Sequence, residues 1–123
     1  MNNKLIVTAA LLGNGTTKQM NPAVPYTPEE IARDAVACVK AGAAIVHIHV
    51  RDDEGMETQR FIDAYTAARA ALNAEGLDAI LNLSTGGTGS DELRTAHIEA
   101  IRPEMCSYNP GSINWGTFVY FNP

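Results

Sequence analysis

Two histidines, His47 and His49, lie two residues apart in an aliphatic run that ends at Arg51. Alternate side chains on a strand point to the same face, about 6.6–6.8 Å apart along the chain. Two neutral imidazoles at the carboxyl end of a buried strand can bind one divalent metal ion, most naturally zinc. Two hydrogen-bonded core histidines would give the same spacing. Unpartnered imidazoles are costly to bury among aliphatic residues, so the surroundings favour a metal site.

The sequence offers no third ligand within the usual spacing. His97 falls on a helix pattern and is expected to lie at the surface or to pack against other elements. The acidic run 52–54 is expected to be a solvated charge run that precedes a helix. Cys38 and Cys106 follow no metal-ligand spacing, and we expect buried free thiols in a reducing cytoplasm. Two protein ligands with an open position indicate catalysis rather than a closed structural zinc site.

A second group of polar residues follows another apolar run. Asn82 and Ser84 alternate with leucines, so their side chains are expected to share one face. The glycine-rich stretch 84–89 leaves backbone N–H groups open, and the helix predicted after it adds its positive end. A carboxylate or phosphate would fit such a cradle, although a tight turn requires the same glycines. The stretch does not match the dinucleotide fingerprint, and residues 13–18 lack the spacing of a P-loop.

A third polar cluster, 108–114, follows the last predicted strand of the sheet. Its amides and hydroxyl can reach the pocket of Ser84, and an Asn-Pro-Gly turn explains the same residues equally well. The chain ends on an apolar run, 118–121, that nothing after it covers, which argues against a complete domain.

Strands and helices are expected to alternate along the chain. Caps and hydrophobic periodicity predict helices over 28–41, about 59–75 and 91–101. Apolar runs predict strands at 4–12, 43–50, 77–83 and about 105–108, the first of them buried on both faces. Such alternation indicates a parallel sheet with right-handed crossovers. Length alone favours a small doubly wound sheet, because a closed (β/α)8 barrel needs about 250 residues.

Composition narrows the class of protein. The 123 residues are 46% hydrophobic and 19% charged, as in one ordinary globular domain. Nine basic against fourteen acidic residues give a net charge of −5, which disfavours nucleic acid as a partner. The longest apolar stretch, 41–50, is too short for a membrane span. No signal peptide precedes the first strand, and a cytoplasmic location is therefore expected.

Four segments together resemble one known family, the β-keto acid cleavage enzymes. They are residues 21–31, 41–51, 82–87 and 111–114, which occur in the order and spacing of that family. The resemblance covers nearly the whole chain. It implies a TIM (β/α)8 barrel and a homotetramer, with members more than twice this length. Residues 1–123 would then be the N-terminal part of a single barrel domain, holding about its first four strands and three helices.

The resemblance also implies a reaction and its site. A β-keto acid and acetyl-CoA, as co-substrate, would become acetoacetate and a new acyl-CoA by Claisen and retro-Claisen chemistry, with zinc as Lewis acid. His47 and His49 match the two histidine ligands. Ser84 and the backbone at Gly87 match the positions that hold the substrate carboxylate, and Asn109 stands where the type member has threonine.

The other groups of the site are of two kinds. Some are residues of this sequence next to the metal ligands, and the others match positions in the second half of full-length relatives. Arg51 and Asn82 are candidates to support the metal ligands. The family's third zinc ligand, a glutamate, and its activating arginine and aspartate correspond to no residue of this sequence. The catalytic residues are therefore unassigned, and the chain alone is expected to be inactive. Gly15 stands where the type member has a glutamate that meets its substrate's amino group, so the resemblance supports an amino-substituted keto acid less than it supports the reaction.

Two other functions remain open on the same residues. A metal-dependent hydrolase also uses His-x-His at a barrel strand end, and it would act without CoA. A non-catalytic α/β domain would bind a small anion at 84–89 without metal.

Overall fold

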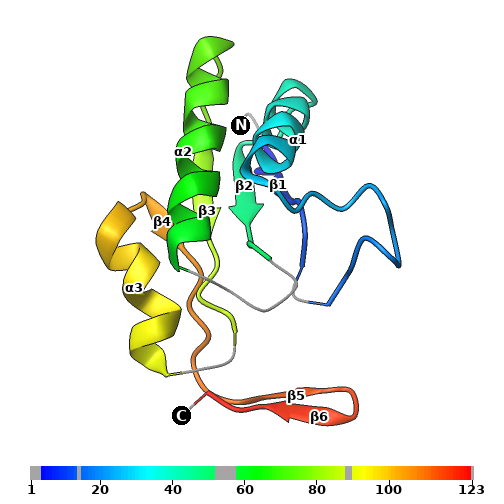
Figure 1. Ribbon diagram of the computed structural model, residues 1–123, viewed down its shortest axis with the longest axis vertical. Helices are drawn as coiled ribbons and strands as arrows, with labels where there is room; N and C mark the ends of the chain where they lie inside the picture. Colours follow the sequence, from blue (N-terminus) through cyan, green and yellow to red (C-terminus); the bar gives the residue numbers. More distant parts are fainter. Residues whose placement is uncertain (1–3, 14, 52–57, 88–89, 123) are drawn as a thin grey trace.

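A computed structural model of the chain describes residues 4–13, 15–51, 58–87 and 90–122 (Figure 1). Four strands form one parallel sheet in the order β1-β2-β3-β4. The strands are β1 (Thr8–Ala10), β2 (Ile45–Ile48), β3 (Ile80–Leu83) and β4 (Met105–Cys106). The helices between them are α1 (Pro28–Lys40), α2 (Thr58–Ala74) and α3 (Asp91–Ile101). The predicted alternation of strands and helices is confirmed.

The strand order decides between the two α/β architectures. Strands follow one another across the sheet in chain order, with no reversal. Right-handed crossovers that all step the same way place their helices on the same face, and α1 does lie beside α2 (Figure 1). A doubly wound sheet reverses its order and carries helices on both faces. The architecture favoured by length alone is therefore wrong, and the chain holds consecutive β/α units of a TIM barrel.

Helix α1 begins as its sequence predicts. The Thr27 side chain accepts a hydrogen bond from the Glu30 backbone N–H at 3.2 Å, and the Glu30 carboxylate accepts one from the Thr27 backbone N–H at 3.1 Å. Pro28 occupies the first helical turn, where a missing N–H costs nothing. The Glu30 carboxylate also accepts from the Tyr26 backbone N–H at 2.6 Å and from the Lys18 ammonium. Glu30 thus joins the loop after β1 to the helix.

These contacts predict how stability responds to acid. The hydrogen bond from Lys18, followed by those from the backbone of Tyr26 and Thr27, lowers the pKa of Glu30 from 4.5 to about 2. The lowered pKa stabilises the folded chain above pH 4.5, and that contribution is lost as the pH falls from 4.5 towards 2. We expect Glu30→Gln to lower the free energy of unfolding at pH 7 and to match the unmodified chain near pH 2. Urea unfolding at several pH values measures this.

Glu29→Gln is the matched control, because Glu29 lies in the same helical turn and has no part in the capping box. A destabilisation by Glu30→Gln that stays constant from pH 7 to pH 2 would show that the carboxylate charge is not responsible.

The core lies between the sheet and its helices. Side chains alternate along β2 and β3, so that one face of each strand is fully buried under the helices. Val46, Ile48, Leu81 and Leu83 have no exposed surface. From the helices, the core receives Ile31, Ala35, Phe61, Ala64, Ala68 and Leu72. The opposite face of β2 and β3 carries His47 and Asn82, which are half-buried. These polar residues therefore lie on the face of the sheet opposite the core.

Several predictions about strand length and burial are wrong. The first strand was expected over 4–12 and buried on both faces, whereas β1 spans three residues and Leu5 is 86% exposed. The cysteines were expected to be buried, whereas Cys38 is half-buried and Cys106 exposed, although both are free. Among the described residues, β1 and β4 each pair with one neighbour, so their outer sides are uncovered. The other strands of the sheet are also shorter than predicted, at 45–48, 80–83 and 105–106 instead of 43–50, 77–83 and about 105–108.

The C-terminal region forms an antiparallel hairpin of β5 (Ile113–Trp115) and β6 (Phe118–Tyr120). Its turn has Gly116 at a positive φ of 63°, which suits a two-residue hairpin loop. Figure 1 shows the hairpin apart from the sheet, on the side towards which β2 points. Phe118 is 58% and Phe121 74% exposed, so most of the apolar run 118–121 is uncovered among the described residues.

No helix in the described part of the chain combines the length and apolar character that crossing a membrane requires.

Candidate functional site

His47 lies opposite Asn82 in the parallel register of β2 and β3. Its Nδ1 is 2.8 Å from the Asn82 Oδ1. An amide oxygen can only accept, so Nδ1 carries the proton and the Nε2 of the neutral ring keeps a lone pair. Metal-binding histidines usually donate their second N–H to a carboxylate or carbonyl in this way. The contact thus supports the prediction that Asn82 orients His47.

His49 lies next to His47 on the same face, with ring centroids 4.9 Å apart and the planes at 80°. Burial, followed by the electrostatic effects of His47 and Arg51, lowers the pKa of His49 from 6.5 to about 4. The ring is therefore neutral at pH 7. Its Nδ1 is buried and has no hydrogen-bond partner among the described residues. Burying this nitrogen without a partner costs free energy, because its hydrogen bond to water is lost and no other bond replaces it.

The two histidines fit a zinc ion. Both can present a neutral imidazole nitrogen, one ring is oriented by an amide, and the other has a buried nitrogen that a ligand would satisfy. Within the part of the chain that the structure describes, no group of three His, Cys, Asp or Glu residues could hold a metal. Asp52, Asp53 and Glu54, expected to be solvated, lie outside the described residues. A third ligand would have to come from elsewhere.

Arg51 has contacts of its own. Its two terminal nitrogens donate to the backbone carbonyls of Thr16 and Gly13, at 2.9 and 2.6 Å. The guanidinium therefore holds the loop after β1 against the end of β2. The positive charge of Arg51 also contributes to lowering the pKa of His49. Arg51 therefore acts on the histidine pair electrostatically.

The predicted cradle at the end of β3 brings Ser84 and Asn109 together. Ser84 is 2% exposed, and its Oγ accepts a hydrogen bond from the Gly86 N–H at 3.1 Å. A Cβ built on Gly86 would lie 3.4 Å from the Ser84 Oγ and 4.0 Å from the Asn109 Nδ2. These two side chains thus flank Gly86, as the expectation of one shared pocket requires. Thr88 and Gly89 of the predicted glycine-rich stretch lie outside the described residues.

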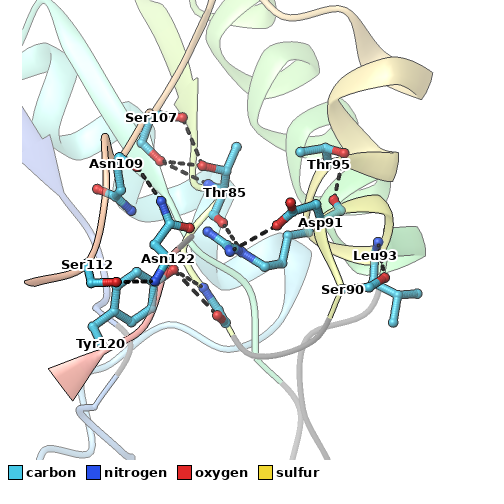
Figure 2. A network of polar contacts seen from close by, with 12 residues as sticks. Thr85, Ser90, Asp91, Leu93, Thr95, Ser107, Asn109, Ser112, Tyr120 and Asn122 are labelled. Atoms are coloured by element: carbon cyan, nitrogen blue, oxygen red, sulfur yellow. Dashed lines mark hydrogen bonds and ion pairs between the residues drawn. The ribbon is translucent and has the colours of Figure 1, made fainter. Parts of the chain in front are cut away.

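Gly87 has a partner that the sequence did not indicate. Its N–H donates to the Tyr120 hydroxyl at 3.4 Å, which brings β6 to the cradle (Figure 2). The Arg94 guanidinium lies 5.7 Å from the centre of the Tyr120 ring. In the described structure, the Gly87 N–H is therefore not left open. An aromatic residue at the end of an apolar run carries no signal that it will meet a glycine 33 residues earlier.

Side chains of α3 and of the segment after β4 hold the backbone of the cradle. The His97 Nε2 donates to the Ser84 carbonyl at 2.9 Å, and the Arg94 Nε donates to the Thr85 carbonyl at 3.1 Å. Figure 2 shows Ser107 facing Thr85, where its Oγ accepts from the Thr85 N–H at 2.9 Å. Burial lowers the pKa of His97, which stacks on Phe61 with ring centroids 3.9 Å apart.

His97 was expected to pack or to lie at the surface. Packing is confirmed, because the residue is 2% exposed, but its hydrogen bond to the cradle was not foreseen. A helical histidine three residues after an arginine was the available signal, and it does not reveal which carbonyls the two residues reach.

Comparison with known proteins gives a consistent result. Residues 4–123 match the sequence profile of the family described as beta-keto acid cleavage enzyme. The chain is 44% identical over 117 residues to the 3-keto-5-aminohexanoate cleavage enzyme of Fusobacterium nucleatum, covering 94% of this chain and 43% of that enzyme. It is 33% identical to the 3-dehydrocarnitine:acetyl-CoA trimethylamine transferase of Rhizobium meliloti, covering 99% of this chain and 48% of that protein.

A solved structure has a similar fold. It is the ternary complex of ObcA with C4-CoA adduct and oxalate, and it matches with a TM-score of 0.66 at 26% identity. The match covers 83% of this chain and 27% of that one. The chain thus spans less than half the length of the relatives it matches.

Proposed function

Because the chain belongs to the beta-keto acid cleavage enzyme family, we propose that its protein is a zinc-dependent acyltransferase. The proposed reaction takes a β-keto acid and acetyl-CoA to acetoacetate and a new acyl-CoA. Relatives whose names contain acetyl-CoA transferase activities, including the one from Rhizobium meliloti, support CoA thioesters as the second substrate. The protein is proposed to be a cytoplasmic homotetramer, with residues 1–123 as the N-terminal part of its barrel domain.

The histidine pair is the observation that carries the proposal. His47 and His49 lie side by side, one ring is oriented by Asn82, and the other has a buried, unpartnered nitrogen. They lie near the carboxyl ends of parallel strands, where TIM barrels place their active sites. A non-catalytic anion-binding domain would have no use for this arrangement.

Zinc held by His47 and His49 would act as a Lewis acid on the oxygens of the keto acid. The chain's own contribution is to orient one ring and to keep the other neutral. Asn82 keeps the proton of His47 on Nδ1, away from Nε2. Burial keeps His49 neutral, because it disfavours the charged ring. The third ligand and the general base are proposed to come from outside these 123 residues.

The substrate carboxylate is proposed to lie at the cradle of Ser84, Gly87 and Asn109. The Ser84 hydroxyl and the Asn109 amide flank Gly86 and can both donate hydrogen bonds. The Gly87 N–H now meets Tyr120 through a long contact of 3.4 Å, and a carboxylate would compete well for that donor. Charge-assisted bonds of this kind would orient the keto acid.

The test uses the full-length protein purified with its metal. We expect zinc by elemental analysis, and acetoacetate formation from a β-keto acid panel that depends strictly on acetyl-CoA. A metal-dependent hydrolase would instead consume substrate without acetyl-CoA. Absence of zinc from a folded, full-length protein would reject the proposal.

Gly86→Ala is expected to impair substrate binding selectively. Gly86 has no positive φ, so alanine brings no backbone strain, but its methyl group would lie 3.4 Å from the Ser84 Oγ. That separation is ordinary van der Waals contact, so the methyl group would be accommodated and would occupy space between Ser84 and Asn109, where the carboxylate is proposed to bind. We expect kcat/KM to fall by about tenfold, mostly through KM, with unchanged zinc content. An unaltered KM would place the substrate elsewhere.

A further inference from the structure

Two backbone carbonyls of the cradle after β3 are bound by one helix. His97 donates to the Ser84 carbonyl and Arg94 to the Thr85 carbonyl, and both donors belong to α3. Their side chains are well buried: His97 is 2% exposed and the Arg94 side chain 10%. Neither residue has a role in the reaction proposed above.

Because the peptide group is planar, these two contacts also fix the directions of the backbone N–H groups in the cradle. Each trans peptide points its N–H opposite to its C=O. With the Ser84 carbonyl held by His97, the Thr85 N–H points away from α3 and meets the Ser107 Oγ. With the Thr85 carbonyl held by Arg94, the Gly86 N–H points away as well and meets the Ser84 Oγ.

The oriented atoms are those proposed to meet the substrate. The Ser84 Oγ and the Asn109 amide flank Gly86, and the peptide that His97 anchors carries Ser84 itself. A rotation of that peptide would turn the Thr85 N–H away from Ser107 and shift the backbone that carries the Ser84 hydroxyl. His97 is also fixed from the other side, by its stacking on the fully buried Phe61.

We infer that His97 is a positioning residue for the substrate carboxylate, which acts by fixing the Ser84 peptide so that the Ser84 hydroxyl and the Gly86 region face the ligand. The inference rests on the proposed function, because it assigns a substrate-related role to the cradle. Arg94 supports the next peptide in the same way.

The test measures two ligands on the full-length, zinc-loaded protein. Acetoacetate carries the carboxylate, and acetoacetamide has the same shape with a neutral amide in its place. His97→Phe keeps an aromatic ring for stacking on Phe61 and removes the donor to Ser84. His97→Gln keeps a donor at a similar reach, and His97→Asn places its donor too close to the helix to reach Ser84.

We expect His97→Phe and His97→Asn to weaken acetoacetate binding about tenfold, as the loss of a well-placed, charge-assisted bond would. Acetoacetamide binding should change less than about twofold, and His97→Gln should stay close to wild type. Ile98→Val is the matched control, since it trims core packing of the same helix and should alter neither ligand. Amide exchange at Thr85, whose N–H belongs to the peptide that His97 holds, should be faster in His97→Asn than in His97→Gln.

Two results would overturn the inference, and they differ in what else they reject. Equal weakening of both ligands, or no weakening, in a wild-type background that prefers acetoacetate would show a purely structural His97. A wild-type protein that binds both ligands equally would reject the carboxylate cradle itself, and with it that part of the proposed function.

Discussion

His49→Ala is expected to lower the zinc affinity of the full-length protein by more than about 100-fold, and His47→Ala should do the same. Each change would leave one histidine of the pair, and zinc sites of catalytic type rely on three protein ligands. Acetyl-CoA-dependent acetoacetate formation should fall with the zinc content. Elemental analysis after dialysis and a competition assay against a chelator measure the two effects.

The fold should survive His49→Ala better than most core substitutions. The change removes a buried nitrogen that has no partner among the described residues, and it leaves the apolar face of β2 untouched. Lys40→Ala is a suitable control, because it removes only an exposed ion pair to Glu75. Unchanged zinc content in the double variant His47→Ala, His49→Ala would reject the metal site.

Asn82→Ala is expected to weaken zinc binding by about 10–100-fold without touching a ligand, since loss of an outer hydrogen-bond partner has that effect in other zinc sites. The His47 Nδ1 proton would lose its acceptor at 2.8 Å, so the ring would be free to rotate or to change tautomer. Chelator competition gives the affinity directly.

Asn82→Asp separates the hydrogen bond from the space that the side chain fills. A carboxylate accepts the same bond more strongly and raises the basicity of the ring, so zinc affinity should be retained or increased. Asn82→Leu keeps a side chain of similar volume without an acceptor, and its zinc affinity should resemble that of Asn82→Ala. If the Asn82→Ala and Asn82→Asp variants bind zinc equally well, the hydrogen bond from His47 to Asn82 has no part in metal binding.

The local elements were predictable because neighbours in the sequence determine them. The capping box at Thr27 and Glu30 involves residues three apart, and it begins α1 where predicted. Ser90 likewise caps α3 through the Leu93 N–H. Alternation along β2 and β3 placed His47 and Asn82 on the face opposite the core.

Strand ends and edges were less predictable, because they depend on partners. How much of an apolar run forms a strand depends on how many of its residues pair with a neighbouring strand. Leu5 and Ile6 belong to such a run, yet β1 pairs only from Thr8 to Ala10. The burial expected for Cys106 failed for the same reason, since β4 has a single neighbour among the described strands.

The sequence by itself determined the chemistry that is available: two histidines on one strand face, a hydroxyl and glycines at the next strand end, and a family pattern around them. Only the tertiary structure decided how these groups meet. The bond from His47 to Asn82 spans 35 residues, and the bond from His97 to Ser84 joins a helix to a strand end. Such contacts depend on sheet register and helix placement, which many weak packing interactions set together and no local pattern encodes.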